Sequence, residues 1–296
     1  MKNADLLVDA RCRLGECALW CDRTAALYWT DIEGSTLGRW READGSVRQW
    51  TLPDRVGSFA LCEQPEQLLL GLASGIALFN LATGATSPIV PVEPEHPGTR
   101  INDGRCDAQG RFVFGMFNAA RGAPPISPFY RVNSQLQVEP LPLPRAGVAN
   151  SIAFSPDGTL MYFTDTWTRQ ICCVDYHADG RIGVPRPFVT VPEEEGFPDG
   201  SAVDSEGGLW SAQWDGGCVV RYDSGGVETA RIPLPASRPT CPSFGGARFD
   251  RLFVTSARIG LDEAALRAQP TAGGVFTWSG AWHGLPEHRF ATDLLA

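Results

Sequence analysis

The sequence of 296 residues predicts an all-β protein, a six-bladed β-propeller with four-stranded blades. Short apolar runs alternate with turn clusters, and 32 glycines and 23 prolines are spread along the whole chain. Helical periodicity is nearly absent, and only residues 262–268 indicate a helix, of about two turns. One unit also recurs roughly every 45 residues, which is the length of a four-stranded propeller blade.

The recurring unit is a turn containing Asp and Gly, followed by a strand of large apolar residues that ends in small or polar ones. The strands of this unit are 26–31, 67–72, 111–116, 160–165, 208–212 and 251–256. Six copies of this size account for nearly the whole chain, so we expect a single domain over residues 1–296. The alternative, a pair of β-sandwich domains, would not produce six evenly spaced copies. We also expect a strand near 6–9 to close the ring by pairing with the last blade, because an open sheet edge is a liability.

The stretch 196–217 shows how these signals place a carboxylate. Pro198-Asp199-Gly200 predicts a turn, because proline presets φ and glycine supplies positive φ. An apolar strand is expected directly after it, at 201–203, so Asp199 would stand where a strand begins, with access to a cavity. The alternative is that Asp199 only caps the turn. Three further acids recur at one position of the blade and are assigned to structural turns: Asp107, Asp157 and Asp204.

Composition limits the classes of partner. The net charge of −9, from 34 acidic and 25 basic residues, argues against nucleic acid and anionic membranes, and suits a small ligand or a metal. The N-terminus lacks the apolar core of a signal peptide, and no apolar run approaches the ~20 residues of a membrane span. We therefore expect a cytoplasmic protein, a monomer or a weak homo-oligomer. The nine cysteines form no CxxC pair and the four histidines are scattered, so reduced thiols are expected and a histidine-rich metal site is not.

Oxygen-bearing side chains precede several of the recurring strands. In a propeller the innermost strands line a central channel, so residues at one point of each blade form a ring. Glu16, Asn150 and Asp199 would converge at the channel mouth, where two carboxylates and an amide oxygen suit one divalent cation. Calcium, magnesium, manganese, iron(II) and zinc are all compatible with these ligands. Alternatively, Glu16 is solvent-exposed, Asn150 caps a turn, and 102–104 forms a hairpin turn.

Five segments, in order along the chain, resemble the gluconolactonase family that includes regucalcin: RLGECALW, RINDGRCDAQGRFVFG, GVANSIAFSPDGTLMYFTDTW, GFPDGSAVDSEGGLWSAQWDGGCVVRYD and SFGGARFDRLFVTSAR. The resemblance implies a six-bladed propeller that hydrolyses sugar lactones at a single divalent metal. It implies that the metal ligands are Glu16, Asn150 and Asp199, with Asp199 also the catalytic base. Arg100 and Asn102 resemble the substrate-binding pair of the family's RxNDG motif.

The sequence departs from animal members of this family where they place an acidic substrate contact, because 118–120 reads Asn-Ala-Ala. Asn118 remains a candidate substrate contact there. The segments 147–150 and 204–217 look closer to bacterial pentonolactonases and aldonolactonases. The expected substrate is an aldono-1,4- or 1,5-lactone, such as xylono-, arabino-, galactono- or gluconolactone.

The expected mechanism is Lewis-acid activation of the lactone by the metal, with Asp199 as general base. No GxSxG motif occurs and no sequence motif pairs a Cys with a basic His, so a Ser or Cys nucleophile is not indicated. Two alternatives remain open. One is a non-enzymatic metal-binding propeller that serves as an interaction scaffold, and the other is a hydrolase of other esters on the same metal site.

Overall fold

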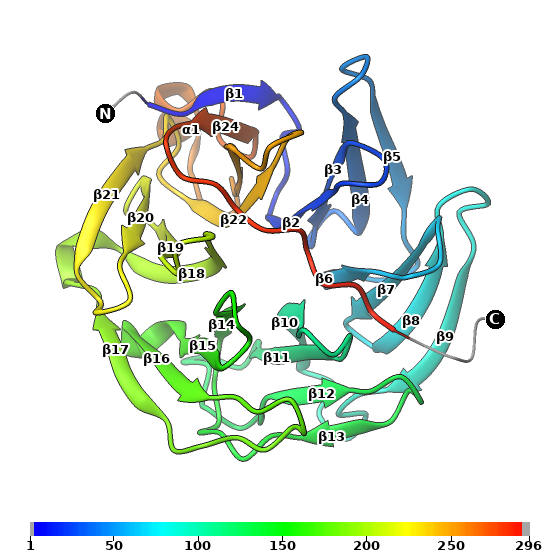
Figure 1. Cartoon of the computed structure of the whole chain (residues 1–296). Helices are drawn as coiled ribbons and strands as arrows, with labels where there is room; N and C mark the ends of the chain where they lie inside the picture. Colours follow the sequence, from blue (N-terminus) through cyan, green and yellow to red (C-terminus); the bar gives the residue numbers. More distant parts are fainter. Residues whose placement is uncertain (1–2, 292–296) are drawn as a thin grey trace.

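Six four-stranded antiparallel sheets form a ring in the computed structural model, which describes residues 3–291 (Figure 1). The first three blades contain β2 (Gly15–Cys21), β3 (Ala26–Asp31), β4 (Thr36–Arg41) and β5 (Val47–Thr51); β6 (Val56–Leu61), β7 (Gln67–Leu72), β8 (Gly75–Asn80) and β9 (Thr86–Pro91); and β10 (Thr99–Cys106), β11 (Phe112–Asn118), β12 (Tyr130–Val132) and β13 (Val138–Pro140). The next two contain β14 (Ala149–Phe154), β15 (Leu160–Asp165), β16 (Gln170–Asp175) and β17 (Arg186–Thr190); and β18 (Phe197–Val203), β19 (Leu209–Trp214), β20 (Cys218–Tyr222) and β21 (Glu228–Pro233). The sixth contains β22 (Pro239–Gly245), β23 (Arg251–Ser256), β24 (Val275–Ser279) and β1 (Asp5–Val8). The predicted fold class is confirmed; the ends of the predicted domain, residues 1–2 and 292–296, lie outside the described residues.

Ring closure also follows the prediction. Strand β1 pairs antiparallel with β24, with Leu6 opposite Phe276, and so supplies the outermost strand of the sixth blade. The backbone groups of β24 that would otherwise face solvent are thereby paired.

Two short 3-10 helices, η1 (Thr166–Thr168) and η2 (Glu193–Glu195), follow β15 and β17. The predicted helix is α1 (Glu263–Ala268), and the Asp262 side chain caps it by accepting a hydrogen bond from the backbone N–H of Ala265. No helix in residues 3–291 is both long and apolar enough to cross a membrane.

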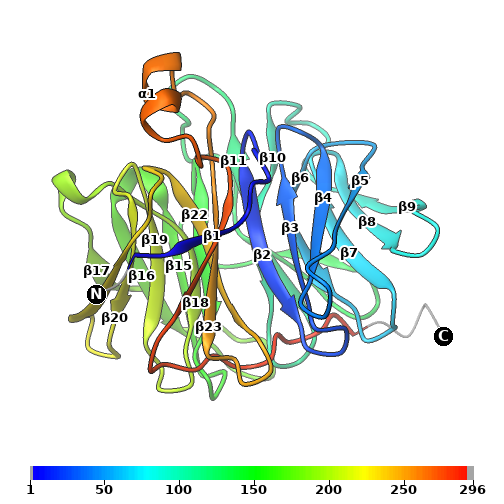
Figure 2. The same ribbon diagram turned by 90° about the horizontal axis from the view of Figure 1, so that it is seen from above.

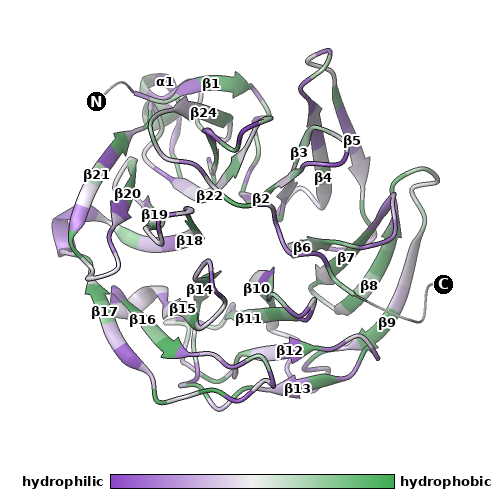
Figure 3. Ribbon diagram, viewed as in Figure 1, coloured by the Kyte–Doolittle hydropathy of each residue, from purple (hydrophilic) through white to green (hydrophobic). Residues whose placement is uncertain are grey.

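The blades pack face to face through large apolar side chains. Trp20 of the first blade stacks on Phe253 of the sixth at 5.5 Å between ring centroids, and Trp210 of the fifth blade meets Phe244 of the sixth edge to face, also at 5.5 Å. Burying such side chains contributes about 1.5–3 kcal/mol each. Strand β8 is hydrophobic over much of its length, whereas outer strand β21 carries hydrophilic stretches (Figure 3). The nine cysteines are free thiols, as expected.

The acids assigned to structural turns have that role. The carboxylate of Asp204 is fully buried and accepts hydrogen bonds from Arg221 Nε at 2.7 Å and Trp210 Nε1 at 2.8 Å. Asp107 pairs similarly with Arg111 Nε at 2.6 Å, and Asp157 accepts hydrogen bonds from the turn around it. These carboxylates fix the turns between inner and second strands.

Two predicted turns are instead parts of strands. Pro198-Asp199-Gly200 lies within β18, which begins at Phe197, and the pairing of β18 with β19 shifts register between Pro198 and Ser201. The alternative of a hairpin turn at 102–104 is likewise wrong, because these residues lie within β10 at a register shift. Pro and Gly, which are typical of turns, also occur at β-bulges, where the strand continues past them.

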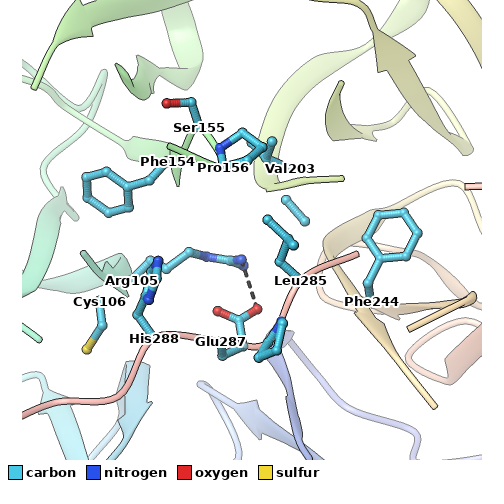
Figure 4. A pocket seen from close by; sticks show the side chains of 12 residues that line it. Arg105, Cys106, Phe154, Ser155, Pro156, Val203, Phe244, Leu285, Glu287 and His288 are labelled. Atoms are coloured by element: carbon cyan, nitrogen blue, oxygen red, sulfur yellow. Dashed lines mark hydrogen bonds and ion pairs between the residues drawn. The ribbon is translucent and has the colours of Figure 1, made fainter. Parts of the chain in front are cut away.

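The chain after β24 crosses one mouth of the central channel (Figures 1 and 2). Its backbone hydrogen-bonds to Ser205 of the fifth blade at residue 283 and to Leu61 of the second blade at Phe290. Between these points Glu287 forms an ion pair with Arg105 at 3.0 Å, beside a cavity of only about 50 Å³ (Figure 4). This end of the channel is therefore closed by the chain itself.

Candidate functional site

A cavity of about 260 Å³ lies at the other end of the channel. The residues that line it are Leu14, Glu16, Arg100, Asn102, Phe117, Val148, Asn150, Thr166, Trp167, Phe197, Asp199, Trp214 and Asp215. The inner strands β2, β10, β14 and β18 contribute the polar residues from their first halves, whereas the C-terminal crossing segment packs at the other ends of these strands. Helix α1 lies on the same side as this cavity, because it follows β23 (Figure 2).

Backbone irregularity accompanies each of these residues. All six inner strands shift register against their neighbours, in β2 after Glu16 and in β14 after Asn150. Cys17 and Ser151, the next residues, have φ of 48° and 58°. A left-handed conformation at a non-glycine residue costs about 1–2 kcal/mol, and such strain gathers where function requires it. The bulges interrupt the alternation of side chains between the two faces of each strand, and so allow Glu16 and Asn150 to face the cavity.

Two carboxylates fix the backbone just before the inner strands β2 and β14, which contain these bulges. Asp31, the last residue of β3, accepts hydrogen bonds from the backbone N–H groups of Arg13 and Leu14, both at 2.9 Å. Asp165, the last residue of β15, does the same for Gly147 and Val148 at 3.0 and 3.2 Å. The final Asp of the sequence repeat therefore fixes the backbone that carries Glu16 or Asn150.

Glu16 and Asp199 place negative charge in this cavity without a direct counter-charge. Asp199 is 5% exposed, and neither carboxylate forms an ion pair within residues 3–291. Burial, and then repulsion by Asp199 and Asp103, raises the pKa of Glu16 well above its usual value. Burial, and then repulsion by Asp103, likewise raises the pKa of Asp199. Both groups would be stabilised by a cation between them.

Asn150 is fixed in one orientation. Its Nδ2 donates to Thr166 Oγ1 at 2.8 Å, and the Thr166 hydroxyl donates to the backbone carbonyl of Pro198 at 3.0 Å. Its Oδ1 accepts a hydrogen bond from Asn102 Nδ2 at 3.1 Å. The amide oxygen is thereby held on the side of the cavity, and the fourth and fifth blades are linked through Thr166.

Arg100 and Asn102 form a pair from β10. Arg100 Nη1 donates to Asn102 Oδ1 at 2.6 Å, and its guanidinium lies 4.4 Å from the ring centroid of Phe117. Its Nε has no hydrogen-bond partner within the described residues. Burial lowers the pKa of Arg100 to about 10, so the group stays charged at neutral pH. A buried cation with an unused N–H is suited to a polar ligand.

Asn118, by contrast, does not line this cavity. It is buried at the end of β11, where its Nδ2 donates to the carbonyl of Pro124 at 3.0 Å and its Oδ1 accepts from the N–H of Ala120 at 3.0 Å. Its amide stabilises the loop that follows β11. Of the sequence-predicted site residues, the structure brings together Glu16, Arg100, Asn102, Asn150 and Asp199.

The side chains present fit a divalent cation. Residues 3–291 contain no group of three or more His, Cys, Asp or Glu side chains arranged to hold a metal. A site in this cavity would therefore combine the carboxylates of Glu16 and Asp199 with the oriented amide oxygen of Asn150. Hard cations such as Ca²⁺ take such mixed oxygen ligands and fill the remaining positions with water. Two carboxylates that share this cavity and form no ion pair within the described residues are the observation that supports this fit.

Sequence reasoning did not identify Thr166 or the aromatic residues that line the cavity, among them Trp167 and Trp214. The signal was present in the Thr-Asp-Thr-Trp run that ends the fourth repeat. The role of these residues in the cavity depends on the positions of β14 and β18, which this short run of sequence does not determine.

The fold and the site define a six-bladed propeller with a cavity at one channel mouth that is lined by carboxylate, amide and guanidinium groups. The family model described as SMP-30/Gluconolactonase/LRE-like region matches residues 14–258. The chain belongs to this family, as its motifs predicted.

Several relatives are similar over nearly their whole length. An L-arabinolactonase from Azospirillum brasilense is 51% identical over 98% of this chain and 96% of that protein. A pentonolactonase from Haloferax volcanii is 31% identical over 96% of each. The crystal structure of a calcium-binding protein, regucalcin, from Agrobacterium tumefaciens superposes with a TM-score of 0.92 at 30% identity, covering 98% of this chain and 97% of that one. The prediction of a lactonase agrees with the names of the two enzymes.

Proposed function

We propose that this protein hydrolyses a sugar lactone to the aldonic acid, using one divalent metal held by Glu16, Asn150 and Asp199. The observation that carries the proposal is the pair of carboxylates, half-buried Glu16 and buried Asp199, which form no ion pair within the described residues and line the same cavity as Arg100 and Asn102. The similarity to enzymes named L-arabinolactonase and pentonolactonase favours a pentonolactone as substrate. Calcium is one candidate metal, since the similar regucalcin is described as calcium-binding.

When bound at these residues, a divalent cation would supply Lewis-acid polarisation of the lactone carbonyl. Asp199 accepts a proton from the attacking water as the water oxygen bonds to the carbonyl carbon. The ring C–O bond then breaks, and the proton passes to the ring oxygen, which becomes the hydroxyl of the open acid. The acid ionises at neutral pH and releases one proton per turnover.

Arg100 and Asn102 orient the substrate. The Arg100 guanidinium donates to Asn102, lies over Phe117 and lines the cavity, where its positive charge suits sugar hydroxyls or the nascent carboxylate. Asn102 Nδ2 also donates to the carbonyl of Ala149 at 2.9 Å, so the substrate-binding pair and the Asn150 amide form one hydrogen-bonded unit.

The released proton gives the test. Base uptake at constant pH is measured with a panel of aldonolactones, using protein stripped of metal and then supplied with one divalent ion at a time. We expect hydrolysis far above the spontaneous rate that returns with at least one metal. A rate equal to the spontaneous one for every lactone and metal would overturn the proposal.

The apolar side of the cavity favours one other substrate class, esters with an aromatic or aliphatic acyl part, so phenyl acetate belongs in the panel. If this ester is hydrolysed faster than any sugar lactone, the substrate class is wrong and the assignment of the site residues still holds.

A further inference from the structure

The lining of the cavity has two chemically different parts. One part is the polar residues described above, and the other includes four aromatic residues: Phe117, Trp167, Phe197 and Trp214. A sugar lactone matches such a cavity, because its hydroxyls need hydrogen-bond partners while its C–H groups present an apolar face. At about 260 Å³ the cavity is smaller than the ≈ 300–1,000 Å³ of sites for drug-sized ligands, and suits one monosaccharide-sized ring.

Three of the four aromatic rings are already covered by a cation. The guanidinium of Arg100 lies 4.4 Å from the Phe117 centroid, that of Arg169 lies 3.7 Å from Phe197, and that of Arg238 lies 5.0 Å from Trp214. These contacts are cation–π interactions within the protein. In the described part of the chain no guanidinium lies over Trp167, which is 56% exposed. Its indole is the ring of the wall that remains open to a ligand.

We propose that Trp167 is the stacking platform for the C–H face of the lactone ring and thereby determines which sugar lactones this protein accepts. This inference rests on the proposed function and deepens it by assigning a residue to substrate choice. An aromatic side chain offers a large contact area and loses little conformational entropy on binding. A sugar ring stacked on it is also fixed in orientation.

The backbone under Trp167 is rigid. Trp167 lies in η1, where the Asp165 carboxylate accepts a hydrogen bond from its N–H and the Thr168 hydroxyl donates to the Asp165 carbonyl at 2.7 Å. The indole meets Phe197 edge to face, with centroids 5.3 Å apart and planes at 82°. A ring held in this way is preorganised for binding.

The platform is also tied to the polar side of the cavity. Thr166, the residue before Trp167, accepts the hydrogen bond from Asn150 Nδ2. The distance between the indole and the Asn150 amide is therefore set by a single turn of backbone. This turn therefore also fixes the distance between the Asn150 amide and the carbonyl of a lactone that is stacked on the indole.

Substrate choice follows from this geometry. A lactone whose hydroxyls leave one ring face free can lie flat on the indole. An epimer with a hydroxyl on that face would push the ring away from the indole, or would leave the hydroxyl desolvated against it. The platform therefore favours epimers with an open C–H face.

Two substitutions test the platform, Trp167→Ala and Trp167→Phe, with Trp282→Phe as the matched control. Trp282 packs on Trp210, with centroids 5.3 Å apart, and does not line this cavity. We expect Trp167→Ala to raise KM by about threefold to tenfold with a smaller change in kcat, and Trp167→Phe to restore most of the loss. The rate ratio between two epimeric lactones should shrink in Trp167→Ala and stay unchanged in Trp282→Phe.

A binding measurement separates this inference from the proposed function. Quenching of tryptophan fluorescence by acrylamide is recorded with and without a lactone or its aldonate product. We expect the ligand to protect a quencher-accessible component in the parent protein and in Trp282→Phe, and this component to be absent in Trp167→Phe.

Each pattern of results is decisive. If the parent protein hydrolyses lactones, but Trp167→Ala keeps its KM and epimer ratio and no component is protected, the platform is wrong and the lactonase stands. If the parent protein hydrolyses no lactone, the proposed function fails, and ligand protection of Trp167 still supports the platform while its absence overturns it. Circular dichroism confirms that each variant is folded before either measurement.

Discussion

Thr166 offers a test of how the candidate metal site is built. Its hydroxyl accepts a hydrogen bond from Asn150 Nδ2 and donates one to the Pro198 carbonyl, so it links two candidate ligand strands without being a ligand itself. Thr166→Val keeps the shape of the side chain and removes both hydrogen bonds. The Asn150 amide then loses the acceptor of its Nδ2 and is oriented only by the hydrogen bond from Asn102 Nδ2 to its oxygen.

The magnitude follows from these two contacts. Removing a residue that orients a metal ligand costs about 10–100-fold in metal affinity. Leaving a buried donor and a buried carbonyl without partners costs about 1–3 kcal/mol each. For a domain of this size each 1 kcal/mol lowers Tm by roughly 2–4 °C. We therefore expect weaker metal binding together with a lower Tm.

Thr164→Val is the matched control, because Thr164 is also buried and its hydroxyl donates to a backbone carbonyl, that of Gln170, at 2.7 Å. Metal dissociation constants are measured by calorimetry or competition, and Tm by circular dichroism. We expect both variants to lose stability and only Thr166→Val to lose metal affinity, with Thr166→Ser near the parent protein. Equal affinities in the two valine variants would refute the role given to Thr166.

Four further outcomes are expected. Asp199→Asn should lower the rate of lactone hydrolysis by roughly 10²–10⁴-fold while the circular dichroism spectrum is retained; near-normal turnover in the folded variant would remove Asp199 from the site. In metal-free protein the pKa values of Glu16 and Asp199 are higher in the folded state than in the unfolded state, so the native state binds more protons. The free energy of unfolding should therefore fall as pH rises from the ordinary carboxyl range through the raised pKa values. A bound cation needs both carboxylates deprotonated, so the rise in Tm on adding metal should grow with pH, and a pH-independent rise would contradict the ligand assignment. Asp204→Asn removes the buried carboxylate that pairs with Arg221 and, among the described residues, leaves it only the exposed Glu206 as an ion-pair partner. This change should cost about 3 kcal/mol in the free energy of unfolding, the lower end of the range for breaking a buried pair. The exposed Asp157→Asn should cost far less, and equal denaturation midpoints would contradict this ranking.

The fold was predictable because its signals are local and repeated. A strand of large apolar residues after an Asp-Gly turn needs only its own sequence to form a blade strand, and six copies imply a ring. The pairing of β1 with β24 was predictable for a related reason, since a closed ring leaves no exposed edge. The helix at 263–268 followed from the one stretch of helical periodicity in the sequence.

Part of the site was predictable in the same way. Glu16, Asn150 and Asp199 precede recurring strands, so a common position in each blade was enough to expect them near one channel mouth, and all three line one cavity. Asn118 shows where this reasoning ends. Its sequence position at the end of β11 suggested a substrate contact, but its amide is satisfied by Pro124 and Ala120 in the loop that follows.

By itself, the sequence determined the number of blades, their closure and the polar residues that each inner strand carries, because strand patterns and turn chemistry act over a few neighbouring residues. Only the tertiary structure decided that Pro198-Asp199-Gly200 is a bulge inside a strand, that Thr166 orients Asn150, and that the ring of Trp167 is left open in an aromatic wall. Each of these depends on contacts between residues that are about 15 to 50 apart in sequence, the scale of one propeller repeat. The bulge and the Asn150–Thr166 hydrogen bond are contacts within one blade, whereas Trp167 meets Phe197 of the next blade. Such contacts exist only once the strands have paired into blades and the blades have packed into a ring.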